Sequence, residues 1–203
     1  MGLYQRVVVP RIVDWACSLP FMSAWRARVC AGLTGEVLEV GFGGGLNVAH
    51  YPAQVTRVHA VEPSDASFAR ARSRLASVTT PVERAGLDGH HLALADHSCD
   101  AALITFTLCT VSDPLRVLAE VRRVLRPGAQ LHFLEHGLAP DARVARWQRR
   151  LDPLERVLAD GCHLTRDAVS LVRAAGFEIL AVEQGFAHGP KPWSYFSVGV
   201  ARA

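Results

Sequence analysis

Short apolar runs bounded by turn signals recur along the chain. They lie at Val37 to Val40, Arg57 to Val61, Val82 to Ala85, Ala101 to Thr107 and Gln130 to Leu134. Apolar runs of this length are typical of strands that are buried on both faces of a sheet. The run at Val82 to Ala85 is the weakest, and all five together predict the central part of a parallel sheet.

Amphipathic stretches separate these runs. Ser64 is placed to cap a helix in the stretch SDASFARARSRLAS, and Asp113-Pro114 to begin a helix over Leu115 to Leu125. Leucine and valine recur at helical spacing in the second helix, which Pro127-Gly128 ends. Strands that alternate with helices predict right-handed βαβ units and a parallel sheet covered on both faces.

The C-terminal part breaks this alternation. After a predicted helix from Arg166 to Ala175, closed by Gly176, come two strand-like runs, Phe177 to Gln184 and Tyr195 to Val200, with no helix predicted between them. Neighbouring strands without a crossover helix pair as an antiparallel hairpin. The predicted fold is therefore α/β: a Rossmann-like, doubly wound, mostly parallel sheet of seven strands that ends in an antiparallel hairpin.

The length of 203 residues, 50% of them hydrophobic, fits one domain with a full core. We expect residues 1–34 to form an N-terminal helical cap, residues 35–137 a cofactor-binding core, and residues 138–203 a lid helix, the last helix and the terminal hairpin. The aromatic residues expected in the cap, as a flap over the cofactor, are Tyr4, Trp15, Phe21 and Trp25.

Charge and cysteine content exclude several classes of function. The formal net charge of +3 is too small and too scattered to favour nucleic acid binding. The five cysteines form no C-x-x-C pair, which indicates neither a disulfide framework nor a zinc site, and a reducing, cytoplasmic location is expected. Proline and charge interrupt the apolar stretch VVVPRIVDWACSLPFMSAW, which predicts neither a signal peptide nor a membrane span.

Four of the five residues from Gly41 to Gly45 are glycine, directly behind the first apolar run. Such a loop lets backbone N–H groups surround a ligand. The spacing G-x-G-x-G differs from the dinucleotide-binding G-x-G-x-x-G, and no Gly-Lys-Ser/Thr follows, which excludes a P-loop. Glu39 would repel a pyrophosphate but suits a ligand with positive groups, such as the ammonium and sulfonium of S-adenosylmethionine.

A second acidic residue, Glu62, ends the second apolar run 17 residues after Gly45. A carboxylate at this point can accept hydrogen bonds from both hydroxyls of a ribose. The dipole at a helix N-terminus also favours an acidic residue, so both interpretations remain open for Glu62 taken alone. Together with Glu39 and the glycines, Glu62 is interpreted as the ribose contact.

The chain resembles the class I, seven-stranded S-adenosylmethionine-dependent methyltransferases. Leu38 to Gly45 is similar to the family's first motif, and Leu92 to Asp100 to its L-P-F-x-D-x-S-F-D segment, with Ala93 for proline and Cys99 for phenylalanine. Glu120 to Gly128 is similar to the structural helix end E-x-x-R-x-L-x-P-G. The resemblance implies an enzyme that uses S-adenosyl-L-methionine and holds it with Glu39, Gly41, Gly43, Gly45, Asn47, Glu62, Pro63, Asp88, Gly89 and Thr105.

Further segments resemble the methyltransferase-like proteins that methylate thiols, including hydrogen sulfide. They are Phe106 to Ser112, Phe133 to Gly137, Trp147, Leu151 to Pro153 and Asp160 to Arg166. The run Asp-Gly-Cys-x-Leu-Thr-Arg is the most specific of them. A more distant resemblance to phosphatidylethanolamine N-methyltransferases and quinone C-methyltransferases leaves those acceptors open, as well as a module that binds the cofactor without turnover.

Methyl transfer from a sulfonium is an in-line displacement, so the protein acts mainly by aligning the reactants in a pocket without water. A thiol reacts as its anion, which a nearby base would favour. His136 is the candidate base, and Asp160 and His163 are candidates to close over the pocket. Cys109 and Cys162 are expected to be single cysteines without an adjacent base, so neither a protein nucleophile nor a metal site is predicted.

The stretch from Ala142 to Ala159 is predicted to be a basic amphipathic helix. Two interpretations remain open: a lid helix with a solvated arginine face, or a helix that contacts an anionic membrane surface. The expected partner is correspondingly a small thiol or a lipid-like acceptor, and the oligomeric state is left open. The basic residues Arg143, Arg146, Arg149, Arg150 and Arg156 alternate with Val144, Trp147, Leu151, Leu154 and Leu158.

Overall fold

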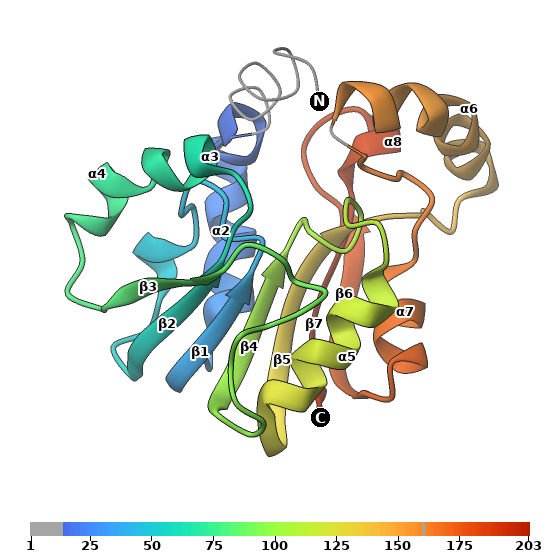
Figure 1. The fold of residues 1–203 in the computed structure, drawn as a ribbon. Coiled ribbons are helices and arrows are strands. Elements are labelled where there is room, and N and C mark those ends of the chain that lie inside the picture. Colours follow the sequence, from blue (N-terminus) through green and yellow to red (C-terminus); the bar gives the residue numbers. More distant parts are fainter. Residues whose placement is uncertain (1–13, 160) are drawn as a thin grey trace.

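The computed structural model describes residues 14–159 and 161–203 of the chain. They form a seven-stranded sheet with the strand order β3-β2-β1-β4-β5-β7-β6 (Figure 1). The strands are β1 (Gly35–Val40), β2 (Val55–Val61), β3 (Val82–Gly86), β4 (Cys99–Thr105), β5 (Leu125–His136), β6 (Glu178–Phe186) and β7 (Tyr195–Arg202).

The direction of the strands confirms the predicted topology. Strands β1 to β5 are joined by parallel pairings, whereas β7 runs antiparallel to both of its neighbours, β5 and β6. The sheet is therefore doubly wound and Rossmann-like, and it ends in the expected antiparallel hairpin.

Several predicted boundaries differ from the structure by a few residues. Strand β4 ends at Thr105, because Phe106 has a positive φ of 52° and turns the chain out of the sheet. Strand β5 begins at Leu125, before the predicted start at Gln130. The prediction of no helix between β6 and β7 is wrong, since the short helix α8 (Lys191–Ser194) lies there with a proline in its first turn. It does not cross the sheet, so the two strands still pair directly.

The helices form where the sequence offers caps. The Ser64 hydroxyl accepts the N–H of Ser67 at the start of α3, and Asp113 and Asp167 cap α5 and α7 in the same way. The predicted helix after Ser64 is divided at Ala71 into α3 and α4. The helices are α2 (Pro20–Cys30), the 3₁₀ helix η2 (Val48–His50), α3 (Asp65–Arg70), α4 (Arg72–Leu75), α5 (Pro114–Val124), α6 (Ala142–Leu158), α7 (Ala168–Ala174) and α8.

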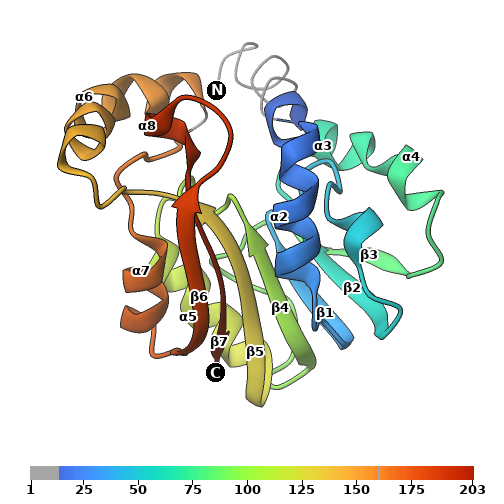
Figure 2. The same cartoon turned by 180° about the vertical axis from the view of Figure 1, so that it is seen from behind.

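Helices cover both faces of the sheet. Helices α5 and α7 lie on one face and α2 on the other, as the two opposite views show (Figures 1 and 2). Alternate residues of one strand consequently enter different cores: Ile104 packs with the α5 and α7 side, and Leu103 with the α2 side. Burial on both faces explains why the strands read as continuous apolar runs. Within the described residues, no helix has the length and apolar character needed to cross a membrane.

Candidate active site

A cavity of about 810 Å³ opens at the carboxyl ends of β1, β2 and β4. Open α/β sheets bind ligands at this edge, where the strand order reverses. Here the reversal lies between β1 and β4, the neighbours in the centre of the sheet. The volume is within the range of about 300–1,000 Å³ that small-molecule sites occupy.

The glycine loop forms one wall of this cavity. Gly41 and Gly43 have positive φ values of 79° and 57°, which glycine adopts without strain. The Glu62 carboxylate accepts the N–H of Gly43 at 2.7 Å and the N–H of Ser64 at 2.8 Å. Burial raises the pKa of the Glu62 carboxyl, and these two N–H groups partly oppose the shift. Glu62 therefore joins the loop to the start of α3 and lines the cavity, as a ribose contact requires.

Glu39 lies beneath the loop and does not line the cavity. Its carboxylate accepts hydrogen bonds from Asn47 Nδ2 at 2.9 Å and from the Tyr51 hydroxyl. Asn47 also donates to Thr105 Oγ1 at 3.0 Å and accepts from Arg26 Nη1 at 2.7 Å. Burial raises the pKa of Glu39 to about 7, although the bonds from Tyr51 and Asn47 lower it. The position of Glu39 supports the loop from below.

Most of the residues expected to hold the cofactor surround the cavity. Glu39 and Gly45 do not: a Cβ on Gly45 would meet Ala71, Phe42 and Val48, so this glycine permits close packing inside the protein. Predicted residues that line the cavity are Gly41, Gly43, Asn47, Glu62, Pro63, Asp88, Gly89 and Thr105.

Trp25, one of the aromatic residues expected in a flap over the cofactor, lies elsewhere. Trp25 packs edge-on against Phe196 of β7, in the core between α2 and the sheet. Cys17 and Arg26 line the cavity instead, and no sequence pattern singled out either of them. Tyr4 lies outside the described residues.

His136 lies at the end of β5 beside two cysteines. Its Nδ1 is 3.8 Å from Cys162 Sγ, and Cys162 Sγ is 3.5 Å from Cys109 Sγ. Burial lowers the pKa of His136, but the Cys109 thiol and the Glu135 carboxylate raise it by more. Cys109 has its pKa raised by the contact with Cys162 and by burial. The expectation that the two cysteines stand alone is wrong, because the fold joins residues 53 positions apart.

Two charged residues hold the loop that carries Cys109. The buried Glu135 carboxylate accepts the N–H groups of Thr107, Leu108 and Cys109 at 2.7, 2.9 and 3.2 Å. Arg166 Nη1 donates to the carbonyls of Leu108 and Val111, each at 2.6 Å. Sequence reasoning assigned no role to either charge, although both lie in the segments that resemble thiol methyltransferases.

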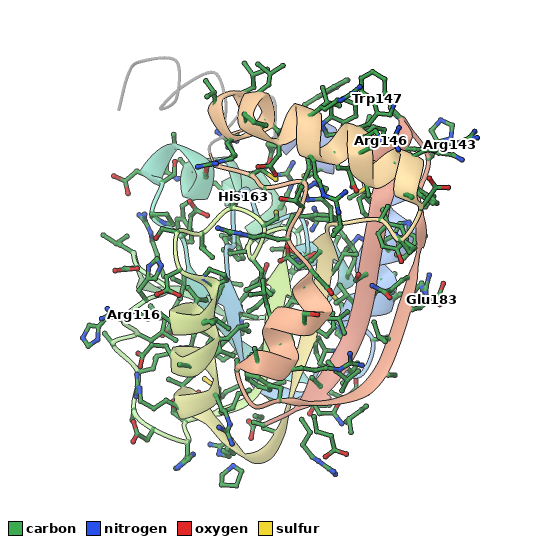
Figure 3. The ribbon with its side chains drawn as sticks, turned by 90° about the vertical axis from the view of Figure 1, so that its right-hand side faces the viewer. Arg116, Arg143, Arg146, Trp147, His163 and Glu183 are labelled. Carbon is green, nitrogen blue, oxygen red and sulfur yellow. The ribbon has the colours of Figure 1, made fainter. Side chains whose placement is uncertain are left out.

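His163 lines a second cavity, of about 610 Å³. In the view of Figure 3 this histidine lies below α6. Its Nδ1 is 3.6 Å from Asp152 Oδ2, and its backbone N–H donates to the Cys109 carbonyl at 2.8 Å. Burial and the charge of Arg166 lower the pKa of this histidine. Thr110 lines both cavities, so the two adjoin. Asp160 lies outside the described residues, and its predicted role stays a prediction.

A buried polar side chain attaches helix α6 to the rest of the protein. Its buried residues include Gln148, whose side chain bonds the N–H of Ala139 and the carbonyls of Gly137 and Pro192. Trp147 and Leu154, two of the apolar residues that alternate with the arginines, are 54% and 55% exposed. Arg143, Arg146 and Trp147 extend outward together (Figure 3). The exposed surface of α6 is therefore both basic and apolar.

Comparison with known proteins agrees with this geometry. The sequence profile of the methyltransferase domain matches residues 38–133. Thiol S-methyltransferase TMT1B from Rattus norvegicus is 35% identical over 175 residues, which cover 83% of this chain and 69% of the relative. Thiol S-methyltransferase TMT1A from Homo sapiens is 36% identical over 162 residues, covering 75% of this chain and 65% of that protein.

Solved structures share the fold. A SAM-dependent methyltransferase from Thermotoga maritima superposes with a TM-score of 0.70 at 24% identity, covering 98% of this chain and 97% of the other. The sheet order, the glycine loop at its carboxyl edge and the similarity to curated methyltransferases lead to one conclusion. The chain belongs to the class I S-adenosylmethionine-dependent methyltransferases, enzymes whose methyl donor is S-adenosyl-L-methionine.

Proposed function

We propose that this enzyme methylates a small or apolar thiol, hydrogen sulfide included, and releases a methyl thioether or methanethiol with S-adenosylhomocysteine. The observation that carries the proposal is the extent of the similarity to proteins named thiol S-methyltransferases, which covers 83% of the chain. The methyltransferase domain profile stops at residue 133. The similarity therefore covers more of the chain than the part that the general profile recognises.

The cavity fits the cofactor. Glycines with positive φ bring backbone close to the ligand space, and the Glu62 carboxylate is within reach of a ribose. Asp88 and Gly89, which the resemblance places among the residues that hold the cofactor, lie on the cavity wall as well. The bound cofactor supplies an electrophilic methyl group on a positively charged sulfur.

The remaining walls suit a thiol acceptor. Phe106 and Val111, from the loop after β4, give the cavity an apolar side where a thiol with an alkyl or aryl group can lie. An apolar wall excludes water and favours alignment of the sulfur with the methyl group. Thiolates are strong nucleophiles, so alignment and ionisation of the thiol are the two tasks left to the protein.

Transfer of an isotope-labelled methyl group tests the proposal. Purified enzyme is incubated with labelled S-adenosylmethionine and, separately, sulfide, an alkyl thiol, an aryl thiol, phosphatidylethanolamine vesicles and a quinol. We expect label in the thioether products. Label in the phospholipid or the quinol but in no thioether would overturn the acceptor, and cofactor binding without any transfer would indicate a binding module.

A further inference from the structure

Cys109, His136 and Cys162 form a compact group of metal-ligand atoms. Their sulfur and ring nitrogen atoms all lie within 4.8 Å of one another. Three separate segments contribute them: the loop after β4, the end of β5 and the segment between α6 and α7. All three cluster residues are buried or half-buried.

Two of the three distances within the cluster are close to those of a tetrahedral soft-metal site. A tetrahedral zinc ion with bonds of about 2.3 Å to sulfur and about 2.0 Å to nitrogen separates two sulfur ligands by about 3.8 Å, and sulfur from nitrogen by about 3.5 Å. Here Cys109 Sγ and Cys162 Sγ are 3.5 Å apart, and Cys162 Sγ is 3.8 Å from His136 Nδ1. Shifts of a few tenths of an ångström would bring the two measured pairs to these distances.

The ligands are held by their surroundings. Glu135 binds three consecutive N–H groups that end at Cys109, and Arg166 binds the carbonyls of Leu108 and Val111 from the other side. The His163 N–H, one residue after Cys162, donates to the Cys109 carbonyl. Supporting bonds of this kind fix the direction of metal ligands and increase affinity. Two thiolates with a divalent cation also make a group without net charge, which reduces the cost of burial.

The cluster leaves one ligand position to a small molecule. Among residues 14–159 and 161–203, no fourth histidine, cysteine or carboxylate side chain belongs to the group. Three protein ligands with an open fourth position are the pattern of catalytic zinc, whereas structural sites have four protein ligands. The cluster adjoins both cavities, because Thr110, whose hydroxyl is 3.5 Å from Cys109 Sγ, lines both.

We propose that Cys109, His136 and Cys162 bind a thiophilic divalent cation, Zn²⁺, whose fourth position takes the sulfur of the acceptor. The cation site stands on the cluster geometry, and its role in catalysis rests on the proposed thiol methylation. His136 is then a metal ligand and not the base predicted from the sequence.

The transfer step balances without another reactant. A thiol that coordinates zinc gives its proton to water and becomes a thiolate. A lone pair of this sulfur forms the new S–CH₃ bond, while the bond from the methyl carbon to the sulfonium breaks and its electron pair stays on the departing sulfur. The products are S-adenosylhomocysteine and a neutral thioether, or neutral methanethiol when the acceptor is hydrogen sulfide; either neutral product is a weaker ligand than a thiolate and leaves the cation.

Metal binding is measured first, without reference to activity. Chelator-treated enzyme is titrated with Co²⁺, whose tetrahedral thiolate complexes give strong visible and near-ultraviolet bands. We expect one ion per chain, displacement by Zn²⁺, and loss of the bands in Cys109→Ser, Cys162→Ser and His136→Asn. Cys99→Ser, which changes another buried cysteine outside the cluster, is the matched control and should bind like the wild type.

The acceptor is then added without cofactor. A thiol should shift the visible bands of the Co²⁺ enzyme, and metal removal should reduce thiol methylation at least tenfold, with recovery on addition of Zn²⁺. Absence of stoichiometric metal binding, or a Cys109–Cys162 disulfide in the purified protein, overturns the site. Full-rate thiol methylation by metal-free enzyme overturns its catalytic role and leaves the proposed function intact. Metal binding without methylation of any thiol supports the site and overturns the function.

Discussion

The cofactor side and the acceptor side of this active site are built in different ways. The centre of the cofactor side comes from one continuous stretch, β1 to the start of α3, where backbone groups and the Glu62 carboxylate predominate. Asp88, Gly89 and Thr105 add to its wall from β4 and the segment after β3. The acceptor side that we propose combines the loop after β4, the end of β5 and the segment before α7. Backbone geometry fixes the first, and side chains that meet through long-range packing fix the second.

This difference separates features that methyltransferases with different acceptors can share from features that are particular to this chain. A glycine loop that depends on backbone conformation works for any acceptor. The general methyltransferase profile, which matches residues 38–133, contains this loop and Glu62; of the acceptor-side cluster it contains Cys109 but neither His136 nor Cys162. The sulfur and imidazole groups of the acceptor side depend on where distant segments meet. Changes on the cofactor side should therefore affect folding and cofactor affinity, and changes on the acceptor side should affect turnover.

The largest effect is expected at Gly41. A Cβ at this position would overlap the Thr107 side chain, and the φ of 79° is unfavourable for any other residue. Gly41→Ala should lose cofactor binding and about 2–4 kcal/mol of unfolding free energy. Gly43→Ala is the control, because its Cβ would meet nothing closer than 3.9 Å, and its loss should be about 1 kcal/mol. Equal losses in denaturant unfolding and calorimetry would contradict the steric argument.

The second prediction concerns the pH dependence of stability through Glu39. The pKa is raised to about 7 in the folded protein, so folding favours the protonated acid. This contribution is present in full below the ordinary pKa of about 4.5 and is lost as pH rises through 7, amounting to roughly 3 kcal/mol. Glu39→Gln should lack this loss, so its unfolding free energy should improve relative to the wild type between pH 5 and 8. Parallel pH profiles of the two proteins in urea would argue against a protonated Glu39.

A third expectation separates charge from structure at Glu62. Glu62→Ala removes an acceptor for two backbone N–H groups and for the proposed ribose contact, so cofactor affinity should fall by about 1.5–3 kcal/mol. Glu62→Gln keeps one acceptor oxygen and should lose less. Calorimetry gives both values; an unchanged affinity in Glu62→Ala would remove this residue from the ribose site.

On the acceptor side, Arg166→Ala removes the guanidinium that binds the Leu108 and Val111 carbonyls. Misplacement of the loop should lower turnover about tenfold, or about 1.4 kcal/mol in the barrier, with little change in cofactor affinity. Arg166→Lys should retain part of the activity. If cofactor affinity fell as much as turnover, changes on the acceptor side would not act on turnover separately from cofactor binding, which would contradict the comparison.

The smallest effect is expected on the outer surface of α6. Exposed arginines beside Trp147 and Leu154 should bring the enzyme to anionic vesicles at low salt and release it at high salt. Each arginine near the surface contributes about 1 kcal/mol, so Arg146→Glu should weaken co-sedimentation several-fold. Arg116→Glu, on α5, is the control. Co-sedimentation that does not depend on the charge of the lipid would favour the interpretation of α6 as a lid with a solvated face.

Much of the fold was predictable because its signals are local. Neighbouring residues set the helix caps at Ser64 and Asp113 and the apolar runs of strand length. They also set the change after Gly176 from alternating strands and helices to two successive strands. The division of the helix at Ala71 and the short helix α8 were missed, since both are small adjustments of a connection.

The sequence by itself determined the order of strands and helices, the glycine loop and hence the family, because spacing along the chain fixes backbone geometry. Only the tertiary structure decided that Glu39 lies under the loop, that Gln148 and not Trp147 anchors α6, and that Cys109, His136 and Cys162 meet. The physical reason is distance along the chain. Contacts between segments far apart depend on how the helices and the sheet pack together, and no local pattern records that packing.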